Sequence, residues 1–421
     1  MRESPWLQSA SPAFRLMIAT SWLAPDAWQK NQEEAIRSAI RATPDWTEYL
    51  RLVDRHSTPA LSWAALKRVP GLEVPTPAKQ ELQKRSDACR MQAVQHSLLL
   101  AQILKAFNRA GVPVMVMKGT LLSLELYGDL GLRHARDMDL AVTLDDIGRA
   151  QTCLNDLGWR LDSSFFPMTP RQWGQFWRME HHLGFLHSQT GCALELHWRN
   201  VWDTPELTSA RWARSVPAVW QGRSYRAMCP IDQVLYLCSH GGEHAWYRAK
   251  WLGDLARLHA AGRVDWEAAL AHARSAEHAD QAAPLLVCLW LLQVVYGLPL
   301  PHLPGAPWKD LPPVLVDAPL HALKIAKDRT CNDLDMLPAR LRLNRYERLL
   351  LPRRTWRESF FEFAYCRADF SVLRLPDGLF WAYAPLRPLL WFWRRARRGK
   401  PAEIPSVNGL SAIATPKHRK P

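Results

Sequence analysis

The stretch from Gly131 to Asp146, GLRHARDMDLAVTLDD, places two closely spaced aspartates, Asp137 and Asp139, at the start of an apolar run. Its apolar centre predicts a β-strand, and the side chains of a strand point alternately to opposite faces of the sheet. Asp137 and Asp139 therefore share one face with Ala141, whereas the apolar residues between them share the other. Two carboxylates side by side repel each other unless a positive charge lies near them. The pair therefore predicts a face that binds a cationic partner.

The residues before this stretch predict another strand and a helix. Residues 114–117, VMVM, form an apolar run of the length expected for a short buried strand. Lys118, Gly119 and Thr120 follow, and residues 121–127 have the composition of a helix. The order of strand, loop, helix and strand predicts a small α/β unit, with the two aspartates on its second strand.

A later segment predicts a β-hairpin. Residues 183–187 and 193–198 are apolar runs joined by a polar turn around Gly191. Alternation along the second run places Glu195 and His197 on one face and the leucines and tryptophan on the other. Glu195 is therefore a third carboxylate that can share a face with the two aspartates.

Helical patterns surround this unit, which predicts an α+β fold with a small mixed-sheet core flanked by N-terminal and C-terminal helical regions. The most apolar run, residues 283–300, contains Gln293 and Gly297 and predicts a buried core helix rather than a bilayer span. We expect five regions: an N-terminal helical region over 1–110, the α/β core over 111–229, a helical domain over 230–345, a basic aromatic segment over 346–400 and a disordered tail over 401–421.

The chain of 421 residues has 54 Lys and Arg against 40 Asp and Glu, a formal net charge of +14. This excess favours anionic partners such as nucleotides, nucleic acid or a membrane surface, or else it reflects compositional bias. The 8 cysteines form no CxxC pair, and the N-terminus lacks the apolar run of a secretory signal. We therefore expect a cytoplasmic protein with reduced thiols, with peripheral contact to a membrane as an added option.

Three carboxylates on one face predict a site for a divalent cation. Mg²⁺ takes carboxylate oxygens and keeps part of its shell for water and substrate phosphates, and Mn²⁺ accepts the same ligands. Two such ions can activate an attacking oxygen and stabilise a leaving pyrophosphate. The alternative for Asp137 and Asp139 is a solvated strand entry that Arg136 neutralises, and Glu195 can equally pair with an arginine at a sheet edge. His197 either lines the pocket or is a structural histidine.

The order and spacing of these motifs resemble a known family. VMKGTLLSLELYGDLGLRHARDMDLAV, residues 116–142, followed by ALELHW, residues 193–198, is similar to a family of bacterial nucleotidyltransferase proteins in the DNA polymerase β-like superfamily. DRHSTPALSWAALKR, residues 54–68, and CSHGGEHAWYRAKWLGDLARL, residues 238–258, resemble the helical segments that flank this core. The resemblance covers most of residues 40–260.

The resemblance implies a role for each motif. Asp137, Asp139 and Glu195 would form a metal-binding catalytic triad, and an NTP would be the substrate. The nucleotide-binding residues would be Lys118, Gly119, Thr120, Arg133 and Arg136. Members of the superfamily usually have glycine where this chain has Lys118, so the phosphate-binding loop departs from the common pattern.

The sequence HGGEH, residues 240–244, matches the spacing of a zinc-peptidase motif in which two histidines on one helical turn bind the ion. Its two glycines disfavour the helix that this geometry needs, by about 1 kcal/mol each. We therefore expect the segment to pack against the core and to line a cleft beside it. The candidate residues of this acceptor cleft are His197, His240, His244 and Lys250.

Near the C-terminus, residues 379–400, LFWAYAPLRPLLWFWRRARRGK, place Trp and Phe directly before a cluster of arginines. A terminal helix packed through its aromatic residues is the first interpretation, and contact with an anionic membrane surface is the second. Nucleic acid comes third, because no recognition motif accompanies the basic residues.

The leading hypothesis is a nucleotidyltransferase, dependent on Mg²⁺ or Mn²⁺, that moves a nucleoside monophosphate from an NTP to an unidentified acceptor and releases pyrophosphate. The acceptor, a small molecule or a macromolecule, would lie between the α/β core and the helices after Pro230. Three alternatives are kept: a non-catalytic nucleotide- or partner-binding protein of the same fold, a glycosyltransferase that uses the DxD motif, and a zinc hydrolase built on HGGEH.

Overall fold

The computed structural model of the protein describes residues 4–162, 165–200, 203–275, 282–304, 311–325, 337–350, 360–361 and 363–397. Helices come first: α1 Pro5–Gln8, α2 Pro12–Thr20, α3 Asp26–Arg41, α4 Trp46–His56, α5 Pro59–Lys67 and α6 Thr76–Arg109. A mixed region follows: β1 Met115–Val116, α7 Thr120–Tyr127, β2 Asp137–Ala141, η1 Leu144–Asp146, α8 Ile147–Asp156, β3 Trp159–Leu161, α9 Pro170–Met179, β4 His182–His187, β5 Ala193–His197, α10 Pro205–Arg214, β6 Val216–Trp220 and β7 Arg223–Ala227. Helices complete the described chain: α11 Pro230–Glu243, α12 Ala249–Ala260, α13 Trp266–Ala273, α14 Ala282–Tyr296, α15 Pro313–Lys324, α16 Leu337–Leu350, α18 Arg367–Val372, η4 Asp377–Ala382 and α19 Tyr383–Arg397.

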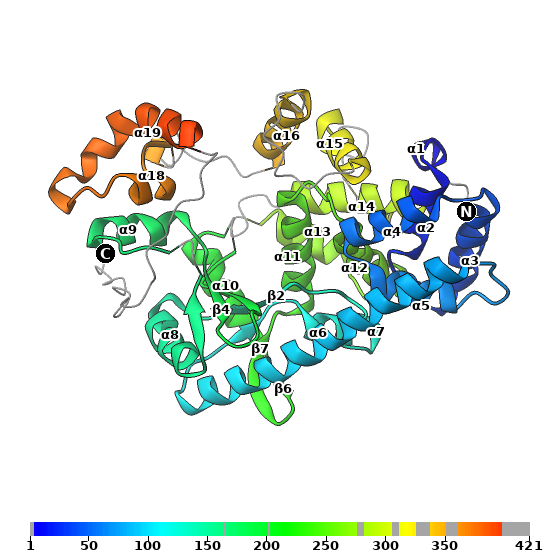
Figure 1. The fold of residues 1–421 in the computed structure, drawn as a ribbon, viewed down its shortest axis with the longest axis horizontal. Helices are drawn as coiled ribbons and strands as arrows, with labels where there is room; N and C mark the ends of the chain where they lie inside the picture. Colours follow the sequence, from blue (N-terminus) through cyan, green and yellow to red (C-terminus); the bar gives the residue numbers. More distant parts are fainter. Residues whose placement is uncertain are drawn as a thin grey trace.

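The long helix α6 joins the N-terminal helices to the sheet (Figure 1). It has 34 residues, which corresponds to about 50 Å at 1.5 Å per residue. Its N-terminal part packs against α4 and α5, and it also contacts α8 and β7. Nearer the N-terminus, the Asp45 carboxylate caps α4 by accepting hydrogen bonds from the backbone N–H groups of Thr47 and Glu48.

Seven strands form one mixed sheet in the order β3-β4-β5-β2-β1-β7-β6. β2 is parallel to β5 and β1 is parallel to β7, whereas the other neighbouring strands are antiparallel. The strand predicted at 114–117 and the hairpin predicted at 183–198 are confirmed as β1 and as β4 with β5. The predicted α+β fold class, with a mixed sheet and helical regions at both ends, is confirmed.

The two faces of the sheet bury different side chains. On one face Met138 and Leu140 of β2 belong to an apolar core that also contains residues of α6 and α8. The opposite face of β2 carries Asp137, Asp139 and Ala141, and Ala141 belongs to the larger core that the N-terminal and C-terminal helices share. The acidic face of β2 is therefore turned toward this helical part of the molecule.

Helix α14 lies at the centre of the C-terminal helices and contacts α11, α12, α13 and α15. Most of its side chains are buried, which confirms the prediction of a core helix in residues 283–300. No helix in the described part of the chain is long and apolar enough to cross a membrane.

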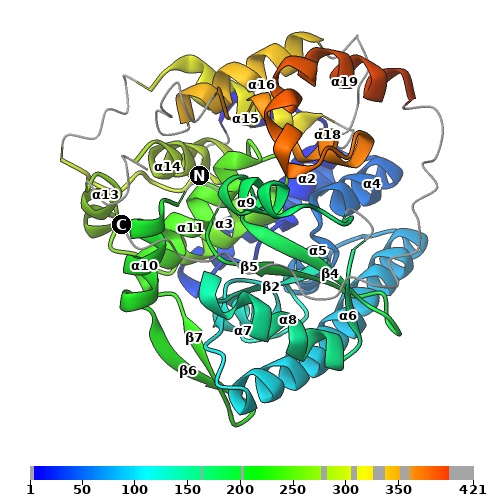
Figure 2. The same cartoon turned by 90° about the vertical axis from the view of Figure 1, so that its left-hand side faces the viewer.

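Helix α18 and the short helix η4 contact α9, and α19 packs against α18. Figure 2 shows α9 next to α18 and α19, and Figure 1 shows these elements apart from the N-terminal helices. The side-chain amide of Gln172 on α9 donates a 2.8 Å hydrogen bond to the Tyr383 hydroxyl of α19, and Arg171 donates to the backbone carbonyl of Asp377. Tyr383 and Phe370 are fully buried there. The predicted tail, residues 401–421, lies outside the described residues.

Candidate active site

The two central carboxylates of the candidate site come from neighbouring strands. In the parallel pair of β2 and β5, Asp139 is the register partner of Glu195, and Asp137 is the partner of Ala193. Asp139 is only 1% exposed, whereas Glu195 reaches solvent. Electrostatic repulsion by Asp139 is the main cause that raises the pKa of Asp137, and burial adds to it. The register therefore brings three carboxylates to one face, with Asp139 deepest.

Lys118 occupies the space beside Asp139. Just after β1, the backbone N–H of Met117 donates a hydrogen bond to the backbone carbonyl of Asp139. The next residue, Lys118, therefore lies beside Asp139, and its side chain reaches the Asp139 carboxylate. Lys118 Nζ is 2.9 Å from Asp139 Oδ1, and both side chains are buried. Burial opposes both charges, but their mutual attraction prevails: the pKa of Lys118 is raised and the pKa of Asp139 is lowered. The pair is therefore charged.

Two histidines complete this cluster. His197 Nε2 lies 3.4 Å from Asp139 Oδ1 and 3.3 Å from Glu195 Oε2, and His182 Nε2 lies 3.9 Å from Glu195 Oε1. Burial disfavours the charged form of His197, but hydrogen bonds to Asp139 and Glu195 outweigh it and raise the pKa of His197. Ligand atoms of Asp139, Glu195 and His197 lie within 4.8 Å of one another, as do those of His181, His182 and His197. The site thus contains two overlapping groups that can hold a metal ion.

The predicted phosphate loop lies at the start of α7. Gly119 has a φ of +90° and is the N-cap of this helix, and its carbonyl accepts a hydrogen bond from the Ser123 N–H. Only glycine adopts this backbone conformation without strain. The N–H groups of the first helical turn have no partner within the helix and attract anions. Arg136, just before β2, is exposed.

Two predicted residues lie behind the carboxylates rather than in a cleft. Arg133 Nε is 2.7 Å from Asp254 Oδ2, with the two side chains 2% and 0% exposed, so Arg133 anchors the loop before β2 to α12. Lys250 Nζ donates to the backbone carbonyl of His134. Burial lowers the pKa of Lys250 to about 7, and repulsion by Arg133 contributes. These positions favour structural roles for Arg133 and Lys250.

A cavity of about 210 Å³ opens next to the cluster. Its wall on the sheet side includes Lys118, Glu195 and His197, and its opposite wall comes from α11. The remaining lining residues are His181, His182, Asn200, Asp203, Arg211, Tyr236, Ser239, His240, Glu243 and His244. The structure therefore brings the predicted cleft residues His197, His240 and His244 to one cavity. The adjacent pair His181-His182 was missed by sequence reasoning, although two consecutive histidines before a strand were a visible signal.

The HGGEH segment lies in the last turn of α11, not in the middle of a helix. Ligand atoms of His240, Glu243 and His244 lie within 4.8 Å of one another. A Cβ at Gly241 would be 2.3 Å from the Trp246 ring, which is fully buried. At least one of the two glycines is therefore required for packing, because the chain turns back at the end of α11.

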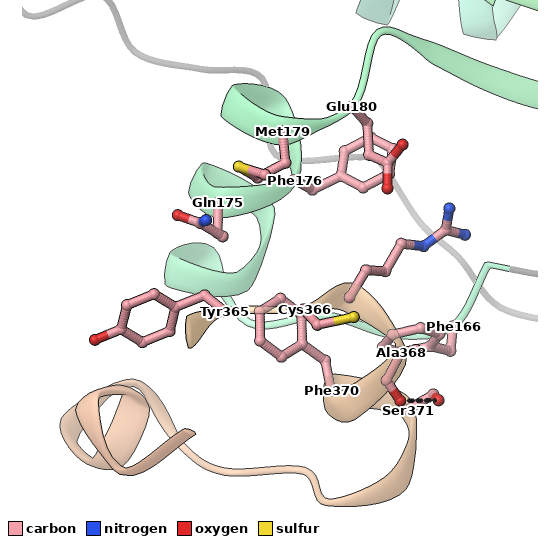
Figure 3. Close-up of a pocket in the computed structure, with 11 residues that line it drawn as sticks. Phe166, Gln175, Phe176, Met179, Glu180, Tyr365, Cys366, Ala368, Phe370 and Ser371 are labelled. Atoms are coloured by element: carbon pink, nitrogen blue, oxygen red, sulfur yellow. Dashed lines mark hydrogen bonds between the residues drawn. The ribbon is translucent and has the colours of Figure 1, made fainter. Parts of the chain in front are cut away.

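A larger cavity of about 500 Å³ lies between α9 and α18 (Figure 3). Its lining is mainly aromatic and aliphatic, and it includes Phe176, Glu180 and Phe370. Glu180 directly precedes the histidine pair of the first cavity, and Arg199 donates hydrogen bonds to backbone carbonyls at this end of α9, including that of Glu180. This second cavity borders the candidate site but does not contain its carboxylates.

Comparison with known proteins identifies the family. A search of curated proteins and a search of solved structures found no match. The profile of a family described as "Uncharacterised nucleotidyltransferase" matches residues 42–297. The match covers more than half of the chain and includes the three carboxylates, Lys118 and both walls of the first cavity. The protein belongs to this family of uncharacterised nucleotidyltransferases.

Proposed function

We propose that the protein transfers a nucleoside monophosphate from an NTP to an acceptor in a reaction that depends on Mg²⁺ or Mn²⁺. The observation that carries the proposal is the register pairing of Asp139 with Glu195 beside a cavity, with the N-terminus of α7 following Lys118. Carboxylates that share a face and a helix N-terminus are the groups that a metal-bound triphosphate needs. Membership of the nucleotidyltransferase family supports the same reaction class.

The residues present fit a divalent cation. Asp139 Oδ2 is buried and has no hydrogen-bond partner among the described residues, which leaves a negatively charged oxygen for a metal. Asp139 and Glu195 would hold the ion, and Asp137 and His197 lie on the same face to complete its shell. When bound, the cation would offset the charge of the phosphates and acidify the attacking group.

The protein's own groups would bind and orient the two substrates. The backbone N–H groups of Gly119 and Thr120 would donate hydrogen bonds to phosphate oxygens, and the exposed Arg136 would pair with the triphosphate. An acceptor hydroxyl in the cavity would attack the α-phosphorus as the bond to the β-phosphate oxygen breaks, and pyrophosphate would leave. Oε2 of Glu195 would accept the proton that the acceptor hydroxyl loses. His197 Nε2 lies 3.3 Å from this oxygen.

The proposal is tested by incubating the protein with each NTP, Mg²⁺ or Mn²⁺ and a cell extract that supplies acceptors. Pyrophosphate release and transfer of label from an α-phosphate-labelled NTP are measured. We expect metal-dependent transfer that Asp139→Asn and Glu195→Gln each reduce by about a thousandfold. Glu33→Gln, on the distant helix α3, is the matched control and should keep full activity. Equal activity in all variants would show that Asp139 and Glu195 take no part in the reaction.

A second candidate function is supported by the ion pair of Lys118 with Asp139. An ammonium group at 2.9 Å from the deepest carboxylate could replace the metal altogether and leave a nucleotide- or partner-binding protein without turnover. Nucleotide binding measured by calorimetry, together with no label transfer to any fraction of the extract, would favour this function over catalysis.

A further inference from the structure

Lys118 is placed as a fixed cation of the carboxylate site. Its Nζ is 2.9 Å from Asp139 Oδ1, and attraction to Asp137 and Glu195 adds to the contact. The side chain is only 10% exposed and the carboxylate 1%. A charged group so deeply buried stays where its counter-ion is, because moving it into apolar surroundings would cost several kcal/mol.

The charges of the site can be counted. Asp137, Asp139 and Glu195 carry three negative charges when ionised, and Lys118 neutralises one of them. A histidine that binds a metal ion must give up its proton, so His197 adds no charge when the ion is bound. The two negative charges that are left then match a single divalent cation. Two divalent ions beside the same ammonium group would give this small site an excess of positive charge, which strong mutual repulsion disfavours.

We propose that Lys118 takes the place of a second metal ion, so that the carboxylate site binds one divalent cation instead of two. This inference rests on the proposed function, because it assumes that the carboxylates bind metal. Lys118 would carry the positive charge that a second ion would otherwise supply to the substrate phosphates. It is a positioning and charge-compensating residue in the metal-binding step.

The test uses Mn²⁺ alone, followed by equilibrium dialysis and electron paramagnetic resonance of the full-length protein. We expect one Mn²⁺ per chain with the six-line spectrum of an isolated ion. Lys118→Met removes the charge and should raise the number to two, with a spectrum broadened by coupling between neighbouring ions. Lys118→Arg keeps the charge and should bind one. Circular dichroism confirms that each variant is folded, and Lys118→Gln replaces Lys118→Met if that variant is not.

The outcomes separate a failure of the one-metal inference from a failure of the proposed function. Two coupled ions in the unmodified protein, or one ion in Lys118→Met, would overturn the one-metal inference and leave the proposed function standing. No Mn²⁺ bound to the unmodified protein or to Glu33→Gln would instead contradict the metal site of the proposed function. One ion in the unmodified protein and in Lys118→Arg, with two in Lys118→Met, supports the inference.

A second, independent observation concerns the surface of the C-terminal helices. Every exposed Phe or Trp side chain in the described part of the chain lies there: Phe360, Phe361, Phe363, Trp381, Trp391, Phe392 and Trp393. Trp381 of η4 is 61% exposed and Phe392 of α19 is 65% exposed, and Leu389 of α19 is 66% exposed. Aromatic side chains rarely gather on a free surface in water, so this concentration indicates a partner. We name these seven aromatic residues and Leu389 the aromatic surface.

The charge of the same segment indicates what that partner is. The sequence of residues 383–400 contains Arg387, four arginines within residues 394–398 and Lys400, and no acidic residue. Arg387 and Arg394 are already paired with the buried Asp369, which holds α18 against α19. The rest of the cluster adjoins the aromatic surface in sequence. Aromatic side chains next to arginines match the boundary between the headgroups and the acyl chains of an anionic bilayer.

We infer that the aromatic surface seats the protein on an anionic lipid bilayer. The segment is fixed to the sheet through α9, by Gln172 to Tyr383 and by Arg171 to Asp377. The 500 Å³ apolar cavity between α9 and α18 would then lie close to the membrane (Figure 3). A peripheral contact of this kind needs no membrane-spanning helix.

The test is co-sedimentation with vesicles of phosphatidylcholine alone and of phosphatidylcholine mixed with phosphatidylglycerol. We expect binding to the anionic vesicles, weakened by high salt, and a loss of about tenfold in affinity for the double variant Trp381→Ala, Phe392→Ala. Val219→Ala is the matched control, because Val219 is 68% exposed but lies on β6. Failure to bind anionic vesicles, unchanged binding by the double variant, or binding to RNA that the same variant abolishes would overturn the inference.

Discussion

Asp139 of β2 and Glu195 of β5 are register partners on neighbouring parallel strands. Neighbouring strands are about 4.8 Å apart, so carboxylates at paired positions repel each other strongly unless cations lie among them. Lys118 and His197 are the cationic and hydrogen-bonding neighbours that the chain supplies. The apolar residues on the other face of both strands hold this register, because a slip of one residue would bury the carboxylates in the core.

The first prediction concerns the ion pair of Arg133 with Asp254, whose side chains are 2% and 0% exposed. Asp254→Ala should lower the free energy of unfolding by about 3–5 kcal/mol, because it leaves the Arg133 charge buried without its partner. Urea unfolding followed by circular dichroism measures the loss.

Two further variants separate charge from packing in this prediction. The double variant Arg133→Met, Asp254→Leu should recover much of the stability, since it removes both charges of the pair. Glu33→Ala removes the partner of Arg37 in a surface pair with side chains about one-third exposed, and should change stability by less than about 1 kcal/mol. Equal effects of Asp254→Ala and Glu33→Ala would mean that the buried pair contributes no more than a surface pair.

The second prediction concerns pH. Burial, together with repulsion by Lys250 and Arg136, lowers the pKa of His134 to about 3, against an ordinary value of 6.5. Between these two pH values His134 is protonated in the unfolded chain but not in the folded protein. The free energy of unfolding therefore falls as the pH drops from about 6.5 toward 3. Above about pH 6.5 His134 is neutral in both states and does not change the stability of the protein with pH.

His134→Gln should therefore lose less stability than the unmodified protein between pH 7 and pH 5, by about 1–2 kcal/mol. Glutamine can keep the hydrogen bond that His134 Nε2 makes with Gln92 Oε1. Melting temperatures at the two pH values give the difference, and the other histidines contribute equally to both proteins. An identical pH dependence would show that His134 titrates normally in the fold.

Much of the sheet could be predicted from the sequence, because strand alternation depends only on neighbouring residues. The faces of Asp137, Asp139 and Glu195 follow from a period of two and are those of β2 and β5. The pairing of Asp139 with Glu195 could not be predicted from spacing, since it needs the strand order and the register. The family resemblance supplied that link instead.

Pairs of side chains that lie far apart in the sequence could not be predicted from it. The family resemblance implied that Arg133 binds phosphate, whereas the structure pairs it in the core with Asp254, more than a hundred residues later. The signal in the sequence was Asp254 itself, the one acidic residue of α12. His181 was overlooked for a related reason: its place in the cavity depends on how α9 turns into β4.

The third prediction concerns Asp369, which is fully buried and pairs with both Arg387 and Arg394. Asp369→Ala leaves two guanidinium groups without their shared carboxylate and should loosen α19 from α18. We expect trypsin to cut the C-terminal segment at least about tenfold faster in this variant. The sheet should keep its stability, so the main unfolding transition should move little. A large shift of that transition would mean that the C-terminal helices and the sheet unfold as one unit.

The fourth prediction concerns Gly241, the first glycine of HGGEH. A Cβ at Gly241 would lie 2.3 Å from the ring of Trp246, which is fully buried and sits at a positive φ of 54° just after Ala245 at 47°. The ring cannot move away, because its backbone is held in this reverse turn. Gly241→Ala should therefore lower the free energy of unfolding by about 1–3 kcal/mol, although alanine is the better helix former.

The matched control is Gly174→Ala on α9, where nothing lies within 4 Å of the added Cβ. This variant should raise stability by about 0.5–1 kcal/mol, because glycine loses more conformational freedom on folding than alanine does. The two variants make the same chemical change in two helices, so opposite signs in urea unfolding assign the cost at Gly241 to Trp246. If Gly241→Ala is stabilising as well, the close approach to Trp246 is not what requires glycine at that position, and a ligand of the cavity becomes the reason to examine next.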